Sequence, residues 1–334
     1  MNTELQNENH NLQLALCRVS VSVIRTALHN NIEVTELSDT LPSAIGIDEF
    51  KGDSGHWNAT TKHYDTERFL TNVVDLKTGK FYDILPRANY RSIIRYFKSF
   101  SLEELSSVKF FSSDMAPYLK QIHDKLFPKS ILCVDYFHVV QLINNAITQI
   151  RNRYIRNMRD QLKMTTIDTE QMELKRRIKT LVGARKLLIK NEGTEFTTDI
   201  MELERRAQRR RILFDAYPDL EPAYNQLQDF HLLRHNAKSQ LPDCNNLLIF
   251  SINQAALIRS WAGKCMDTGI DELAEAGNTI HNWAQYIANA WCYPEYNNGI
   301  VEGKNNRIKT LKRITYGMHC FKNFRTRIMM LDKN

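Results

Sequence analysis

The segment Ala44-Ile-Gly-Ile-Asp48-Glu-Phe50 is a short run of apolar, β-capable residues that ends in two carboxylates. Two later segments, residues 108–114 and 130–135, follow the same pattern, because each passes from apolar residues into an aspartate. Such runs predict buried strands. Ligands bind an open sheet outside the carboxyl ends of its strands. We therefore expect three carboxylates at one edge of a sheet: Asp48, Asp114 and Asp135.

Neighbouring carboxylates repel each other unless a cation neutralises them. Hard oxygen ligands of this kind suit Mg²⁺, with Mn²⁺ as a substitute. A single aspartate after a strand is more often a cap of the following turn than a metal ligand. Three of them in one predicted sheet favour a divalent metal site.

The remaining pattern predicts a sheet core followed by a long helical part. Residues 68–75 and 80–85 flank a loop that ends in Gly79, which is typical of a hairpin. Helices are expected over residues 14–29, around 93–97, over 116–127, and from 137 to about 293. Breaks near Gly193, Pro218 and Pro242 divide the long stretch into several packed helices, and a last helix covers about 300–313.

The chain has 334 residues, and its 45 Lys and Arg against 38 Asp and Glu give a net charge of +7. Residues 151–211 carry 17 basic and 9 acidic residues, and residues 299–334 carry 9 and 2. Two basic zones favour a polyanion such as nucleic acid, although either run alone is more simply a solvated face. No membrane span or export signal is expected, and the six scattered cysteines fit reduced thiols in a cytoplasm.

Residues 297–313 form the most distinctive stretch of the chain. On a helix, one face carries Glu302, Asn306, Lys309 and Arg313 at i, i+4, i+7 and i+11. Such a face can ligate a metal with its acid and hold phosphates with its cations. Periodicity alone favours the plainer alternative of an ordinary surface helix.

Several motifs together resemble the catalytic domain of bacterial insertion-sequence transposases of the ISL-three family. Besides residues 45–50, the motifs are Ser112-Ser-Asp-Met115, Val134-Asp-Tyr-Phe-His-Val-Val140, Asn298-Gly-Ile-Val-Glu-Gly-Lys-Asn-Asn-Arg-Ile-Lys309 and Tyr316-Gly-Met-His-Cys-Phe-Lys-Asn-Phe-Arg-Thr-Arg-Ile328. The resemblance runs in order from about residue 41 to 330. It implies an α/β fold with a ribonuclease-H-like mixed sheet flanked by helices and interrupted by a large all-α insertion.

This resemblance also implies a division of the chain. Residues 1–40 would be a helical remnant of a helix-turn-helix, and residues 41–145 the first part of the core. Residues 146–292 would form the insertion, and residues 293–334 the C-terminal part of the core with the Glu-bearing helix. Family members usually carry an N-terminal cysteine-rich zinc-binding segment, whereas this chain has only Cys17 before residue 133.

The family's acidic DDE triad falls on Asp48, Asp114 and Glu302. It implies metal-dependent DNA cleavage and strand transfer by two ions, with Asp48 bridging both. Asp135-x-x-His138 resembles a motif that places its histidine near the scissile phosphate, although a histidine hydrogen-bonded at a helix start is an equal alternative. Trp261 belongs to the core or, less simply, stacks on a flipped base. The expected DNA-binding residues are Lys304, Asn306, Arg307, Lys309, Lys312 and Arg313.

The implied partners are the terminal inverted repeats of an element and its target DNA, bound by a homo-oligomer in the bacterial cytoplasm at the nucleoid. Two alternatives stay open at this point. A ribonuclease-H-like nuclease such as a junction resolvase would share the metal site but lack a long basic helical insertion. A non-catalytic, transposase-derived DNA-binding protein would share the fold and need no metal.

Overall fold

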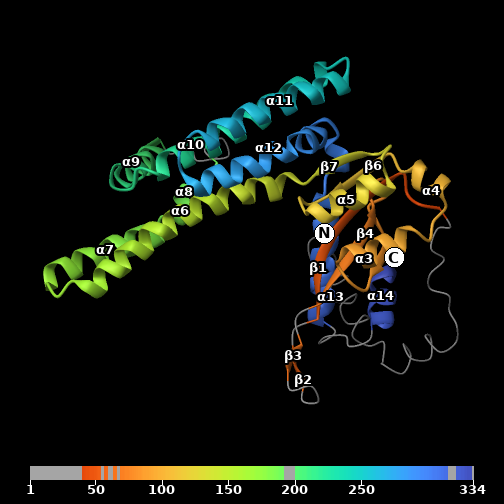
Figure 1. Ribbon diagram of the computed structural model, residues 1–334, viewed down its shortest axis with the longest axis horizontal. Coiled ribbons are helices and arrows are strands. Elements are labelled where there is room, and N and C mark those ends of the chain that lie inside the picture. The colour runs from red at the N-terminus through yellow and green to blue at the C-terminus, as the bar shows by residue number, and fades with distance from the viewer. Residues whose placement is uncertain are drawn as a thin grey trace, which may run out of the picture.

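The computed structural model describes residues 40–53, 56–58, 63–65, 68–191, 200–314 and 321–332. Five of the described strands form a mixed sheet in the order β5-β4-β1-β6-β7 (Figure 1). Their bounds are Ala44–Asp53 for β1, Arg68–Asp75 for β4, Lys80–Leu85 for β5, Phe110–Ser113 for β6 and Ile131–Val134 for β7. The expected helix over residues 14–29 and the break near Gly193 lie outside the described residues.

The sheet has an antiparallel half and a parallel half that meet at β1. β4 pairs antiparallel with β1 and with β5, whereas β6 pairs parallel with β1 and with β7. This mixed sheet, flanked by helices and joined to a large helical part, confirms the predicted ribonuclease-H-like α/β class. A separate two-stranded ribbon, β2 (His56–Asn58) with β3 (His63–Asp65), was not predicted.

Strand β1 alternates between two cores because successive side chains point to opposite faces. Ile45 and Ile47 are fully buried in the larger cluster, with helices α3 (Tyr90–Phe97), α4 (Leu102–Ser107) and α5 (Pro117–Leu126). Ala44 lies in the cluster on the opposite face, against α13 (Gly299–Ile314). The unpredicted α4 is held by a capping box between Ser101 and Glu104, a short-range signal without apolar periodicity.

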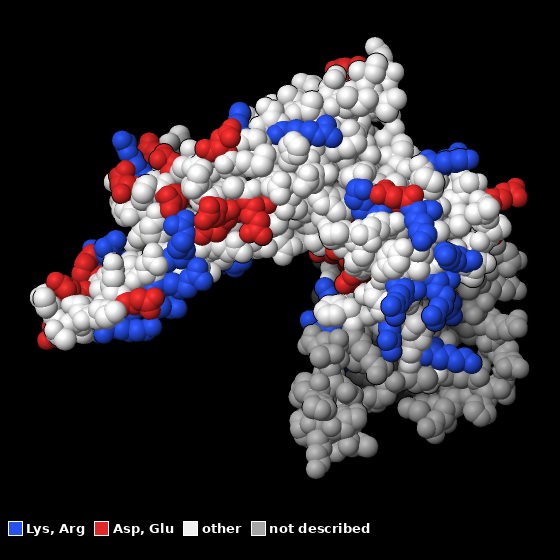
Figure 2. Space-filling model, in the orientation of Figure 1, with Lys and Arg blue, Asp and Glu red and all other residues white. Residues whose placement is uncertain are grey.

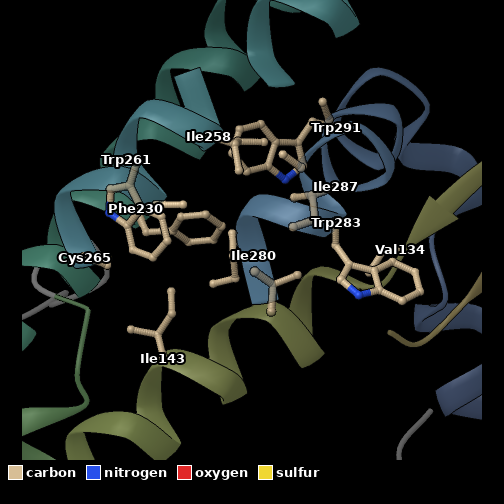
Figure 3. Packing of buried hydrophobic residues seen from close by; sticks show 14 of the residues in the cluster. Val134, Ile143, Phe230, Ile258, Trp261, Cys265, Ile280, Trp283, Ile287 and Trp291 are labelled. Atoms are coloured by element: carbon tan, nitrogen blue, oxygen red, sulfur yellow. The ribbon is translucent and has the colours of Figure 1, made fainter. Parts of the chain in front are cut away.

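The larger cluster continues from the sheet into the helical part, where it is rich in aromatic residues. Figure 3 shows Trp261 and Trp291 packed near Phe230, and Trp283 beside Val134 of β7, among aliphatic residues from several helices. The helices are α6 (Tyr136–Met164), α7 (Asp168–Gly183), α8 (Arg185–Leu188), α9 (Ile200–Ala216), α10 (Leu220–Gln240), α11 (Leu247–Met266) and α12 (Asp271–Cys292), with short 3₁₀ turns at Leu241–Asp243 and Pro294–Tyr296. The predicted breaks at Pro218 and Pro242 are confirmed.

Helix α6 runs unbroken from the end of β7 into the helical part, so residue 145, the expected limit of the first core segment, lies inside it. In Figure 1 the far half of α6 and the antiparallel α7 project away from the sheet as an arm. Among the described helices, none is long and apolar enough to cross a membrane.

Helix α13 returns the chain to β1 and runs alongside it in the same direction. Val301 packs over Gly46, Asn305 bonds Asp48, and the Lys312 ammonium donates to the Lys51 carbonyl oxygen at 2.7 Å. Helix α14 (Phe321–Met330) completes this face, where Phe324 and Ile328 are buried with Phe50. The close fit of α13 depends on the missing side chain of Gly46.

Replacing Gly46 by alanine should therefore destabilise the protein. The added Cβ would lie 2.5 Å from Cγ2 of Val301 and 2.7 Å from Cδ2 of Leu76. We expect Gly46→Ala to lower the free energy of unfolding by about 1–3 kcal/mol, the usual cost of overpacking. Urea denaturation measures it.

Gly303→Ala is the matched control on α13 itself, because nothing lies within 4 Å of the Cβ it would add. It should raise the free energy of unfolding by up to about 1 kcal/mol, since alanine favours helix. Equal midpoints for the two variants would show that α13 does not pack on β1 as described.

Candidate active site

Three aspartates meet at the carboxyl edge of the parallel strands. The register pairs Gly46 with Ser112 and Ser112 with Cys133. Two residues further along each strand, the same register sets Asp48 beside Asp114 and Asp114 beside Asp135. All three fall on the sheet face that α13 covers, because each is an even number of residues from these paired positions. The predicted convergence of Asp48, Asp114 and Asp135 is thus consistent with the register.

The charges of this group act on one another. Burial, together with the neighbouring charges of Asp114 and Asp135, raises the pKa of Asp48 to about 6, against the opposing effects of the Glu49 N–H hydrogen bond and of His138. Burial also raises the pKa of Asp114, with Asp135 adding to the effect, while the Ala116 N–H and His138 oppose it. Two carboxylates that are costly to ionise together are a donor set that a divalent cation stabilises.

Asp135 and His138 form a pair at the start of α6. Asp135 caps the helix, because its Oδ1 accepts the Phe137 N–H at 3.1 Å, and its Oδ2 lies 2.9 Å from Nδ1 of His138. This hydrogen bond raises the pKa of His138 against the opposing effect of burial, and the charges of Asp135, Asp114 and Asp48 add to the increase. Since Asp135 holds Nδ1, Nε2 is the nitrogen left to act on a bound group.

A buried amide relay fixes Asp48 from the other side. Asn72 of β4 donates to the Oδ1 of Asn305 at 3.1 Å, and Asn305 donates to the Oδ2 of Asp48 at 2.8 Å. Asn72 is fully buried and Asn305 is 3% exposed. Nothing in the sequence indicated this role of Asn305. Asn72 and Asp48 precede it by 233 and 257 positions, and only the fold brings the three side chains together.

Glu49 supplies a second carboxylate next to Asp48 in the chain. Glu49 accepts a hydrogen bond from the Tyr118 hydroxyl on α5, and burial raises the pKa of Glu49 against the opposing effect of that bond, with Asp114 adding to the increase. The pair of carboxylates at the end of residues 44–50 was visible in the sequence, but nothing there distinguished the role of Glu49 from that of Asp48. Tyr118 gave no sequence signal.

Glu302 is exposed on α13, one turn before Asn305. Lys304 on one flank of the helix lies over the Phe81 ring of β5, and Glu302 is about 200° around the helix from it. Glu302 therefore lies on the flank of α13 that is turned away from β5. Among the described residues, no three His, Cys, Asp or Glu side chains already surround one point closely enough to hold a metal ion.

The basic residues of α13 divide into three groups, one of which is Lys312 alone, whose ammonium donates to the Lys51 carbonyl oxygen. Lys304 is buried and pairs with Asp332 at 2.5 Å, and Arg307 donates to the same carboxylate at 2.8 Å, so both hold the C-terminal segment. The outward flank beside Glu302 carries the exposed residues Asn306, Lys309 and Arg313.

Trp261 lies in the helical core. Its indole is 4% exposed, packs against Phe230 and donates its N–H to the Gln226 carbonyl oxygen at 3.0 Å. The ring therefore offers no open face to a base in this structure.

Comparison with known families gives one match. The family model DDE_Tnp_ISL3, described as a transposase, matches residues 45–328, a range that contains every acid considered above. No curated protein and no solved structure matches the chain significantly.

The amide relay predicts that two adjacent asparagines differ in importance. Asn305→Ala leaves the buried Asn72 amide without its acceptor and removes the donor to Asp48, so we expect a loss of about 2 kcal/mol in the free energy of unfolding. The exposed neighbour Asn306→Ala should change stability by less than about 0.5 kcal/mol. Urea denaturation of both variants measures the difference, and equal losses would contradict the relay.

Proposed function

Since the chain belongs to the ISL-three family of transposases, we propose that it is a DDE transposase that cleaves DNA at insertion-sequence ends and transfers the strands to target DNA. The observation that carries this proposal is the grouping of Asp48, Asp114, Asp135 and His138 at the sheet edge, inside the matched range. A transposase acts on DNA, and the outward cations of α13 beside this edge suit a phosphate backbone.

In the proposed site, Asp48, Asp114 and Glu302 would hold Mg²⁺, for which Mn²⁺ can substitute. Such ions, when bound, activate an attacking water or 3′-hydroxyl and stabilise the leaving oxygen. The half-buried, mutually repelling Asp48 and Asp114 fit this role because a cation offsets the cost of their charges. Glu302 would supply the third carboxylate from α13, and Asp135 is the alternative ligand.

The other residues of the site position these groups and the DNA. Asn305 fixes the orientation of Asp48, and Asp135 orients His138, whose Nε2 then donates to a phosphate oxygen. Lys309, Arg313 and Asn306 contact the backbone on the outer flank of α13.

The two alternatives have less support. A non-catalytic derivative would not need Asp48 and Asp114, two half-buried acids whose ionisation is costly. A junction resolvase would not need the long helical part between β7 and α13. We further propose that the protein acts as a homo-oligomer on DNA in the bacterial cytoplasm.

Replacing an acid of the triad by its amide should abolish DNA cleavage and leave DNA binding intact. We expect Asp48→Asn, Asp114→Asn and Glu302→Gln each to slow Mn²⁺-dependent nicking of supercoiled plasmid by roughly 1,000-fold or more, because each removes several kcal/mol of transition-state stabilisation. Glu103→Gln, which alters an exposed acid in the first turn of α4, is the matched control and should nick like the wild type.

Anisotropy of a labelled duplex should show unchanged DNA binding for all four variants. If Glu302→Gln nicks normally while Asp135→Asn is inactive, the third ligand is Asp135 and the assignment of Glu302 is wrong. If all variants nick like the wild type, the catalytic proposal fails.

Metal binding gives a test that does not depend on activity. A crystal soaked in Mn²⁺ should show anomalous density beside Asp48 and Asp114, and the Asp48→Asn crystal should lose it, because Asp48 is one of the proposed ligands. Density elsewhere, or none at millimolar Mn²⁺, would overturn the proposed metal site.

A further inference from the structure

A basic groove lies on the projecting arm, away from the carboxylates. It encloses about 330 Å³ between α6 and α7. Its lining residues are Arg151, Asn152, Ile155, Arg156, Arg159 and Val182. In Figure 2, Lys and Arg lie along this arm, with Asp and Glu among them, where α6 and α7 lie in Figure 1.

The arginines of the groove lack acidic partners, unlike their neighbour on the same helix. Arg153 is held by Glu272 at 2.7 Å and by Asp219 at 3.0 Å. In the part of the chain that the structure describes, no carboxylate pairs with Arg151, Arg156 or Arg159, and the buried Nε of Arg151 has no hydrogen-bond partner. Burial, together with the nearby charge of Arg185, lowers the pKa of Arg151. A bound anion would relieve both the repulsion and the unmet hydrogen bond.

The length of the groove favours a polyanion over a small ion. From Arg151 to Arg159, α6 rises about 12 Å at 1.5 Å per residue. Duplex DNA rises about 3.4 Å per phosphate along each strand, so this row of guanidinium groups spans three to four phosphates. A single phosphate would occupy only one of the three.

Helix α6 also links the groove to the candidate active site. Asp135 caps the start of α6 and His138 lies in its first turn, whereas Arg151 and Arg159 follow His138 by 13 and 21 residues on the same unbroken helix. These separations correspond to about 20 and 32 Å, or about 6 to 9 base pairs of B-form DNA. Packing of α6 against α10 and α12, with Ile143, Ile147 and Ile150 buried, fixes its direction.

We propose that the groove between α6 and α7 is a second DNA site, which binds the duplex backbone about 6 to 9 base pairs from the phosphate that is cleaved. The spacing of 6 to 9 base pairs rests on the proposed function, because it is measured from His138 of the candidate active site. The affinity of the groove for DNA does not depend on the proposed function. The groove adds no sequence readout, because arginine contacts to phosphates position a duplex without reading its bases.

The test compares two triple variants of the full chain that each remove three positive charges. Arg151→Gln/Arg156→Gln/Arg159→Gln removes the positive charges of the groove, whereas Lys238→Gln/Arg259→Gln/Lys264→Gln removes exposed cations on α10 and α11, away from it. The probe is a labelled 30-base-pair duplex, titrated by anisotropy at several salt concentrations.

We expect the groove variant to bind the duplex about tenfold or more weakly, and its log–log salt slope to fall by about 2.7, or 0.9 for each phosphate contact. The control variant should change far less. The variant Arg151→Lys/Arg156→Lys/Arg159→Lys should keep most of the salt dependence of the wild type, because it retains the three positive charges. If the groove and control variants bind equally, the second site is refuted.

Stability provides a further readout. Removing unpaired like charges should leave the midpoint of thermal unfolding of the groove variant unchanged or raised, whereas a structural role for these arginines would lower it. If the groove variant loses as much affinity for a single-stranded probe as for the duplex, the assignment of the groove to duplex DNA is wrong.

The spacing is tested on a nicked duplex whose backbone phosphates are ethylated one at a time. Ethylation 6 to 9 base pairs from the nick should weaken binding of the wild type but not of the groove variant. If ethylation at other positions weakens binding instead, the proposed placement is wrong. If the protein does not nick DNA but the groove variant still loses duplex affinity, the proposed function fails while the second site stands.

Discussion

The hydrogen bond from Asn305 to Asp48 joins two parts of the chain on which the whole site depends. It connects α13 to the central strand across 257 residues, and it forms only because Gly46 lets Val301 approach β1. The helical part between β7 and α13 must therefore leave the sheet and return to it in register. Without that return, Glu302 would have no fixed relation to Asp48 or Asp114.

The sheet could be predicted because each main strand carries its own local signal. Residues 68–75 and 80–85 read as a hairpin and form one, and the apolar runs before Asp114 and Asp135 became β6 and β7. Two helices without such a signal were missed: α4 is too short for helical periodicity, and no element was predicted over α14.

The site could be predicted only in part, for a different reason. Strand ends mark aspartates, so Asp48, Asp114 and Asp135 were visible, but the roles of Asn305 and Tyr118 arise from contacts between distant elements. Periodicity grouped the α13 cations without showing which point inward. Lys304 is buried because Asp332, at the other end of the C-terminal segment, accepts its ammonium, and the position of that partner is set by the fold.

The distribution of paired and unpaired charges connects the two sites. Acids without an Arg or Lys partner gather at the start of α6, and arginines without acids gather in its outer half. Arg153, which lies among those arginines, is instead neutralised by Glu272 and Asp219. Ion pairs within the chain would have satisfied both groups if they lay close together, but one rigid helix keeps them about 20 Å or more apart. Under the proposed function, each group would be neutralised from outside, the acids by metal cations and the arginines by DNA phosphates. The same helix would then serve the chemistry at one end and hold the DNA at the other.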